Sequence, residues 1–401
     1  MTPRATPSNA GEGPGSDGIP WYLGAVLFAS TSVVVGVIWD ISWHRTIGRD
    51  SFWTPAHVAI YAGGLAAGLS CGWLALKTTF GGTGPEVGRS VRIWGLRAPL
   101  GAWLGIWGAI AMLTSAPLDD WWHNAYGLDV EILSPPHVVL AMGIDAIQLG
   151  ALLMALSWQN RASRARRRRL CFAYAYGAGM LLLAMAVLTM ERSFPNDWHG
   201  AEFHMISAGV YPVVLFAVGR AGRLPWPATW ASLIYTAVTL AMMWILPLFP
   251  AEPMLAPIMR SVDAMVPPPF PLLLILPAVG IDMLLQRTSG SDRAPPRRSR
   301  DWGIAALGSI VFVGVFGVAH WYFGEFMLSE GARNYFFQGD QWGYFSAPGP
   351  WQYEFWHGGR FAGGDFSASH FWARAVWALP IGFVSARAGL SMGNWMREVR
   401  R

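Results

Sequence analysis

The fold of this chain is decided by residues 20–43, PWYLGAVLFASTSVVVGVIWDISW, an apolar run with one charged residue, Asp40, near its end. A helix that spans a bilayer needs about 20 mostly apolar residues, so this run is long enough to cross. Similar runs recur along the chain and predict an all-α, polytopic membrane protein with about ten transmembrane helices. These helices are expected at 20–43, 55–76, 98–122, 135–158, 170–190, 203–222, 227–248, 269–286, 302–323 and 369–389.

The composition excludes most other protein classes. Of the 401 residues, 53% are hydrophobic and only 13% are charged, whereas soluble domains carry about 25% charged residues. An ordinary soluble enzyme and a disordered chain are therefore excluded. The two cysteines, Cys71 and Cys171, lie in apolar stretches and indicate neither a disulfide framework nor a thiolate metal site.

The positive charge is concentrated in a few connections between the expected helices. Residues 161–169, RASRARRRR, contain six arginines, and further arginines follow at 220–223, 287–300 and 397–401. With ten spans these segments fall on one side, which the positive-inside rule makes cytoplasmic, as are both termini. The net charge of +5 is thereby explained without nucleic acid as a partner.

This topology predicts a bacterial inner-membrane protein in three parts. Residues 1–19 are an expected disordered tail, 20–158 are a four-helix unit, and 159–401 are a six-helix unit with outer loops at 191–204 and 324–368. All nine histidines are expected at or near the outer, periplasmic ends of the helices. Ionisable groups near membrane depth are costly and usually functional.

Two segments of the four-helix unit repeat each other. They are WDISWHRTIGRDSFWTPAHVAIYAGG at 39–64 and LDDWWHNAYGLDVEILSPPHVVLAMG at 118–143. In each segment an aspartate and a histidine are four residues apart, which places them on one helix face. A Thr-Pro or Ser-Pro pair then indicates the start of the next helix, with a second histidine in its first turn.

Each hairpin can thus present one carboxylate and two imidazoles, a ligand set that suits copper, iron or zinc. The two predicted metal sites are Asp40, His44, His57 and Asp119, His123, His137. Residues that could orient these ligands are Arg49, Asp50 and Asp129. A further metal site, or alternatively a polar loop with helix caps, is expected from Glu191, His199, Glu202 and His204.

The stretch from Asp40 to Tyr61 resembles the signature of one integral-membrane subunit of the copper membrane monooxygenases, the particulate methane and ammonia monooxygenase family. The resemblance covers about residues 20–158 and implies that Asp40, His44 and His57 bind a metal near the outer membrane face. His123 and His137 match a second set in that family, where Asp119 replaces the usual asparagine. The six C-terminal helices match no part of that subunit.

The leading hypothesis is therefore a metal-dependent monooxygenase-like oxidoreductase, with copper or alternatively iron or zinc, that oxidises a small apolar or lipid-phase substrate. The sequence does not identify its catalytic residues. The resemblance implies a homo-oligomer or partner membrane subunits, and electrons would come from a donor such as quinol. The alternatives are a periplasmic-side metal-binding or transport protein and a non-catalytic structural subunit of a membrane complex.

Overall fold

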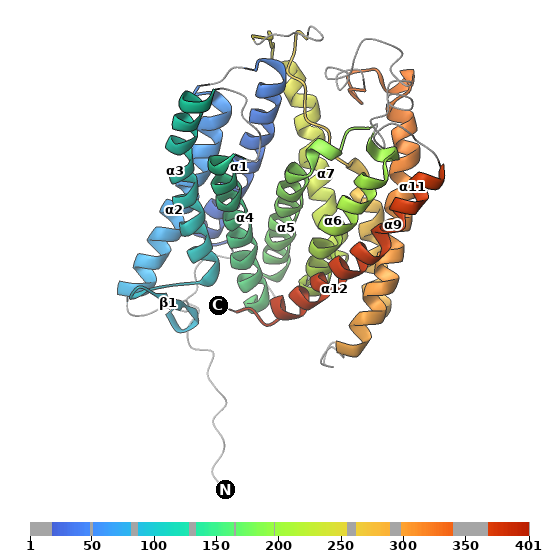
Figure 1. Cartoon of the computed structure of the whole chain (residues 1–401). Coiled ribbons are helices and arrows are strands. Elements are labelled where there is room, and N and C mark those ends of the chain that lie inside the picture. The colour runs from blue at the N-terminus through green and yellow to red at the C-terminus, as the bar shows by residue number, and fades with distance from the viewer. Residues whose placement is uncertain are drawn as a thin grey trace.

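The computed structural model describes residues 18–48, 51–81, 87–127, 134–163, 166–195, 197–254, 262–288, 298–339 and 368–400. These residues are almost entirely helical (Figure 1), which confirms the all-α fold. In this part of the chain nine helices are long and apolar enough to cross a membrane. The protein is therefore an integral membrane protein. Most of the expected tail, and residues 340–367 of the expected outer loop, lie outside the described residues.

The elements follow one another as a series of long helices with short connections. The helices are α1 (Trp21–Thr46), α2 (Pro55–Phe80), α3 (Leu100–Tyr126), α4 (Pro135–Arg161), α5 (Arg167–Leu188), α6 (Ala201–Ala221), α7 (Pro227–Ile245), α8 (Ile275–Thr288), α9 (Arg298–Met327), α11 (Ala368–Ala375) and α12 (Ala378–Met396). Single 3-10 turns lie at η1 (Val87–Arg89), η2 (Met190–Arg192), η3 (Asp197–His199), η4 (Leu246–Leu248), η5 (Leu272–Leu274) and η6 (Glu330–Ala332). Strands β1 (Val91–Ile93) and β2 (Leu96–Ala98) pair antiparallel between α2 and α3.

Two expected spans differ from the observed helices. The run at 369–389 is divided between α11 and α12. The run at 269–286 forms only the 14-residue α8, which is too short to count among the nine candidate spans. Prolines at 267, 268, 269 and 271 precede it. Because proline lacks the amide proton that a helix interior needs, this stretch is extended and the helix begins only at Ile275.

The first four helices form two hairpins, α1–α2 and α3–α4, on one side of the molecule in Figure 1. The paired helices touch at glycines. A Cβ atom on Gly36 would lie 2.8 Å from Cγ1 of Ile60, and one on Gly108 would lie 2.6 Å from the carbonyl oxygen of Gly143. Only hydrogen fits at these crossings, so the backbones approach closely, as small residues permit in membrane helix pairs.

Consecutive hydroxyl residues in the middle of α1 bind three neighbouring helices. Hydrogen bonds join Ser30 to Gln148 of α4, Thr31 to Tyr176 of α5 at 2.6 Å, and Ser32 to the carbonyl oxygen of Ala59 in α2 at 2.7 Å. Because the bilayer core holds no water, these hydroxyl groups must form their hydrogen bonds within the protein. They hold the middle of α1 in a defined position beside α2, α4 and α5.

Both ends of the described helical chain lie at the same end of the bundle. Tyr22, at the start of α1, packs against Trp158 near the end of α4, with ring centroids 6.4 Å apart. Asn160 donates hydrogen bonds to the carbonyl oxygens of Met396 and Val399, at the end of α12. The arginine-rich connection after α4 begins at this end too.

Candidate metal centre

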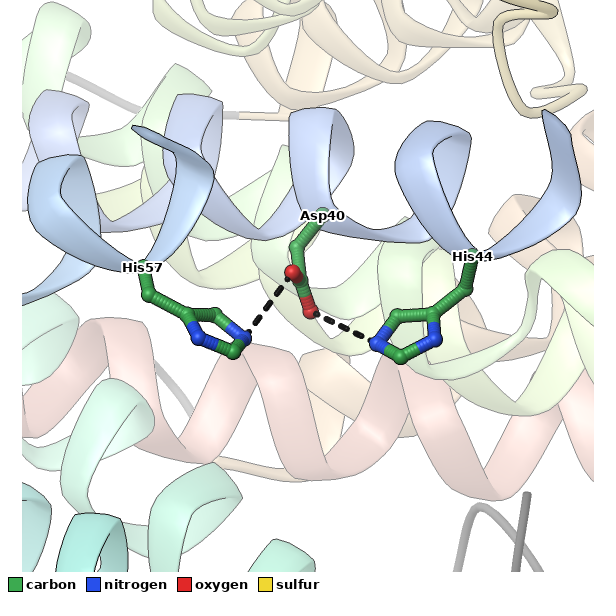
Figure 2. A group of neighbouring side chains, drawn as sticks. All are labelled: Asp40, His44 and His57. Atoms are coloured by element: carbon green, nitrogen blue, oxygen red, sulfur yellow. Dashed lines mark ion pairs between the residues drawn. The ribbon is translucent and has the colours of Figure 1, made fainter. Parts of the chain in front are cut away.

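The first predicted triad is assembled where α1 ends and α2 begins (Figure 2). Asp40 and His44 lie one turn apart near the end of α1, and His57 lies in the first turn of α2. Nε2 of His57 is 3.1 Å from Oδ1 of Asp40, and Nε2 of His44 is 3.8 Å from Oδ2. One ligand atom from each residue lies within 4.8 Å of the other two.

The second triad repeats this arrangement on α3 and α4. Nε2 of His123 is 3.4 Å from Oδ2 of Asp119, and Nε2 of His137 is 3.2 Å from Oδ1. Its three ligand atoms also lie within 4.8 Å of one another. In the part of the chain that the structure describes, these two triads are the groups of histidine, cysteine or carboxylate ligands that could hold a metal ion.

Local structure explains why the second histidine of each triad is well placed. Pro55 and Pro135 occupy the first turns of α2 and α4, as predicted. Ser134 accepts a hydrogen bond from the backbone amide of His137 and thus caps α4. Thr54 holds the same position before α2 but accepts instead from the amide of Ser51, at 2.8 Å. The predicted start is therefore correct for both helices, while the side-chain cap forms only in the second.

The distances in both triads fit a metal ion between the ligands. With metal–ligand bonds of about 2.0–2.1 Å, two ligands at 90° to 110° are separated by about 2.9–3.4 Å. Three of the four His–Asp distances are 3.1, 3.2 and 3.4 Å, and only the His44 distance of 3.8 Å is longer.

The hydrogen bond on the far side of His57 sets its tautomer. Nδ1 lies 2.9 Å from the carbonyl oxygen of Ser51, which can only accept, so Nδ1 carries a proton. In neutral His57 the lone pair of Nε2 then faces the carboxylate of Asp40, an unfavourable pairing. A second proton or a cation between the two atoms removes this repulsion. An imidazole whose other nitrogen donates to a carbonyl is the usual arrangement of a metal-bound histidine.

The triads are shielded but accessible. The side chains of Asp40 and Asp119 are 20% and 23% exposed, and their histidines are between 17% and 36% exposed. Oδ1 of each aspartate is buried and accepts no hydrogen bond in the described part of the chain. Buried polar atoms are normally satisfied, so each of these oxygens needs a hydrogen-bond donor or a cation as its partner.

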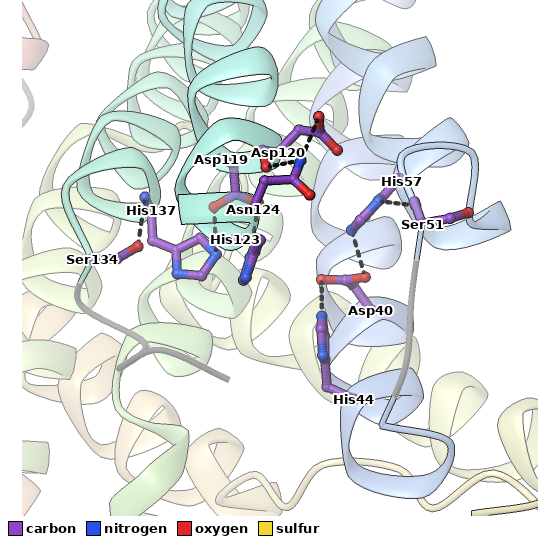
Figure 3. A network of polar contacts seen from close by, with 10 residues as sticks. All are labelled: Asp40, His44, Ser51, His57, Asp119, Asp120, His123, Asn124, Ser134 and His137. Atoms are coloured by element: carbon purple, nitrogen blue, oxygen red, sulfur yellow. Dashed lines mark hydrogen bonds and ion pairs between the residues drawn. The ribbon is translucent and has the colours of Figure 1, made fainter. Parts of the chain in front are cut away.

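Figure 3 shows the two triads on the adjacent α1–α2 and α3–α4 hairpins. Asp120, next to Asp119, is exposed and belongs to neither triad. Its backbone carbonyl accepts a hydrogen bond of 2.8 Å from Nδ2 of Asn124. Arg49, Asp50 and Asp129, which the sequence suggested as orienting residues, lie outside the described residues.

The structure does not bring the four residues of the further predicted site together. Glu191 pairs with Arg45 at 2.9 Å, and exposed Glu202 pairs with Arg192 at 3.6 Å. Nε2 of His199 donates to the carbonyl oxygen of Trp321, and Nε2 of His204 donates to that of Trp198, each at 3.0 Å. Burial lowers the pKa of His199 to about 4, which the bond to Trp321 offsets only in part. These observations favour the alternative expectation, helix caps and a polar loop.

The orienting contact of Ser51 could not be found from sequence, because a backbone carbonyl leaves no residue signature. The pairing of Glu191 with Arg45 could not be found from sequence either, because the two residues lie 146 positions apart along the chain. Compared with known proteins, the chain matches no family model, no curated protein and no solved structure.

Proposed function

We propose that this protein is a membrane metalloprotein whose two triads each bind a copper ion, and that it acts as a monooxygenase-like oxidoreductase. Its substrate would be a small apolar molecule taken from the lipid phase. The observation that supports this most is the presence of two preorganised Asp-His-His groups on rigid helix ends. Iron and zinc suit the same ligands.

The residues of the chain have distinct tasks in this proposal. Asp40 and Asp119 neutralise part of the metal charge and hold two imidazoles each at bonding distance. Ser51 keeps His57 in the tautomer whose Nε2 can bind a metal. A bound copper or iron ion would supply Lewis acidity and redox chemistry at the coordination positions that three protein ligands leave open.

The alternative of a transporter is disfavoured by the interior of the spans. Gln148 is occupied by Ser30. Asp282 accepts hydrogen bonds from the amides of Ala228 and Thr229, at 3.2 and 2.8 Å, and so caps α7. Three polar residues could line a path to the other face: Asp145, Gln148 and Asp282. Within the described chain, only Asp145 forms no hydrogen bond of this structural kind.

A purely structural site is disfavoured by the ligand count. Structural zinc sites are usually closed by four protein ligands, whereas catalytic sites keep three and an open position. Each triad offers three. We therefore propose that the metal sites at this end of the bundle are reactive rather than structural.

The proposal extends to partners and location. The positive-inside rule assigns the arginine-rich end to the cytoplasm, so the triads would face the periplasm from a bacterial inner membrane. A quinol in the membrane, or a partner membrane subunit, would deliver electrons. Exposed Trp53 and Trp121 near the two triads suit the level of the lipid headgroups.

Quinol-dependent oxygen consumption in nanodiscs tests the proposed activity. We expect uptake by the copper-loaded protein, and loss to background when His44→Ala and His123→Ala are combined. Asn124→Ala is the matched control, because Asn124 lies beside the triads but offers them no ligand. A copper-loaded wild type that consumes no oxygen with any apolar substrate would end the oxygenase proposal and leave metal binding standing.

A further inference from the structure

At the end of the bundle opposite the triads, the last turn of α4 holds two distant chain segments in place (Figure 1). Gln159 accepts from the amide of Arg223 and donates to the carbonyl oxygen of Ala221, both at 3.1 Å. Its neighbour Asn160 donates to the carbonyl oxygens of Met396 and Val399, at 3.1 and 2.7 Å. Both amide side chains are buried. The α6–α7 connection and the C-terminal segment therefore meet at the end of α4, next to the start of α5.

This junction collects four arginines from three parts of the chain. Arg167 begins α5, Arg223 lies in the α6–α7 connection, and Arg397 and Arg400 follow α12. All four side chains are exposed and can reach a ligand. Partial desolvation, and then the positive charge of Arg167 and more weakly of Arg400 and Arg397, lower the pKa of Arg223. Arg223 is thus close enough to each of the other three arginines to be repelled by its charge.

No carboxylate in the described part of the chain balances this charge. The buried Asp301 is already occupied, because its Oδ1 accepts from Arg220 at 2.7 Å and its Oδ2 accepts from Asn394 at 2.8 Å. Among the described residues, exposed Glu398 forms no ion pair with the four arginines. Four clustered guanidinium groups without a counter-charge are an anion-binding arrangement, and arginine matches phosphate with two parallel hydrogen bonds.

The position of the junction indicates which anion is available. It lies at the ends of spanning helices. The exposed Trp226 follows Arg223 closely in the sequence, and the exposed Trp395 closely precedes Arg397. Tryptophan at helix ends is typical of the headgroup level of a bilayer. We propose that Arg167, Arg223, Arg397 and Arg400 form a binding site for the phosphate of an anionic phospholipid. The site is independent of the metal centre and of the proposed activity.

One nearby arginine provides a matched control. Arg161, the last residue of α4, donates from Nε to the carbonyl oxygen of Ser157 at 2.9 Å. Its guanidinium lies over the ring of Trp158, 4.5 Å from the centroid. Because this side chain is held against its own helix, Arg161→Gln removes one positive charge, as Arg400→Gln does, but leaves the four-arginine site intact.

The test is lipid binding to the delipidated full-length protein in detergent, measured by native mass spectrometry. The probes are phosphatidylglycerol, phosphatidylcholine and inorganic phosphate. Each arginine near a membrane surface contributes about fivefold to binding of an anionic lipid, so Arg223→Gln with Arg400→Gln should weaken phosphatidylglycerol binding about 25-fold. Arg161→Gln should bind as the wild type does, and phosphatidylcholine should bind weakly to all.

Three results would overturn the proposal. The first is a double variant that binds phosphatidylglycerol as tightly as the wild type does. The second is an Arg161→Gln variant that loses as much affinity for phosphatidylglycerol as the double variant. The third is inorganic phosphate that binds the wild type as tightly as the lipid does. Arg400→Gln alone, at an exposed position near the chain end, guards against misfolding of the double variant. It should lose about fivefold in affinity for phosphatidylglycerol.

Discussion

Replacing Asp301 with alanine should destabilise the protein strongly, because this carboxylate joins three helices. It binds Arg220 of α6 at 2.7 Å and Asn394 of α12 at 2.8 Å, from its own place in α9. The side chains of Arg220 and Asp301 are only 7% and 2% exposed. After Asp301→Ala, the guanidinium stays buried without a counter-charge.

Breaking a buried ion pair on one side costs about 3–5 kcal/mol, which is a factor of roughly 100 to 4,000 in the unfolding equilibrium. The free energy of unfolding in mixed micelles, from denaturant titration followed by circular dichroism, measures this loss. Combining Asp301→Leu with Arg220→Met should restore most of the stability, because neither charge is then buried alone.

The exposed pair of Arg192 and Glu202 is a matched control. Its side chains are 57% and 49% exposed and its charged atoms are 3.6 Å apart. Pairs of this kind contribute about 0–1 kcal/mol, so Glu202→Ala should have little effect. An Asp301→Ala variant no less stable than Glu202→Ala would refute the reasoning that burial makes this pair essential.

Three further predictions concern His199, the α3–α4 hairpin and Glu191. Burial lowers the pKa of His199 to about 4, below the ordinary 6.5. The unfolded chain therefore binds the proton first as the pH falls, and the wild type should lose about 2 kcal/mol more than His199→Gln between pH 7 and pH 5, measured by thermal unfolding. Equal losses in both proteins would contradict this assignment. Gly108→Leu should separate α3 from α4 at the close contact with Gly143, and metal analysis should find the second triad empty and the first still filled. Glu191→Gln should leave the metal content unchanged, since Glu191 pairs with Arg45, and a loss of metal would restore it as a ligand.

Much of the fold follows from the apolar runs, because a segment of bilayer length has no stable alternative to a helix in lipid. The helix boundaries follow less closely from hydropathy. The apolar run predicts that the first helix ends at residue 43, but the helix continues to Thr46. Because of this extension, His44 lies on the same rigid helix as Asp40. The run at 269–286 shows the opposite error, since its prolines stop the helix whatever its hydropathy.

The triads could be predicted because their geometry is local. A four-residue spacing and a proline-started second helix decide where each side chain points. The further site could not be judged in this way. Whether Glu191 and His199 meet depends on Arg45 and Trp321, which lie on other helices and have no sequence relation to the loop.

The central claim is that both triads bind metal, and metal content with EPR spectroscopy on the purified protein tests it most directly. After reconstitution with copper, the wild type should hold about two equivalents with nitrogen hyperfine structure, one for each triad. His44→Ala and His123→Ala should each lose about one equivalent, and Asn124→Ala should lose none. A wild type that stays metal-free after gentle extraction and reconstitution, or variants that retain its full copper content, would contradict the account.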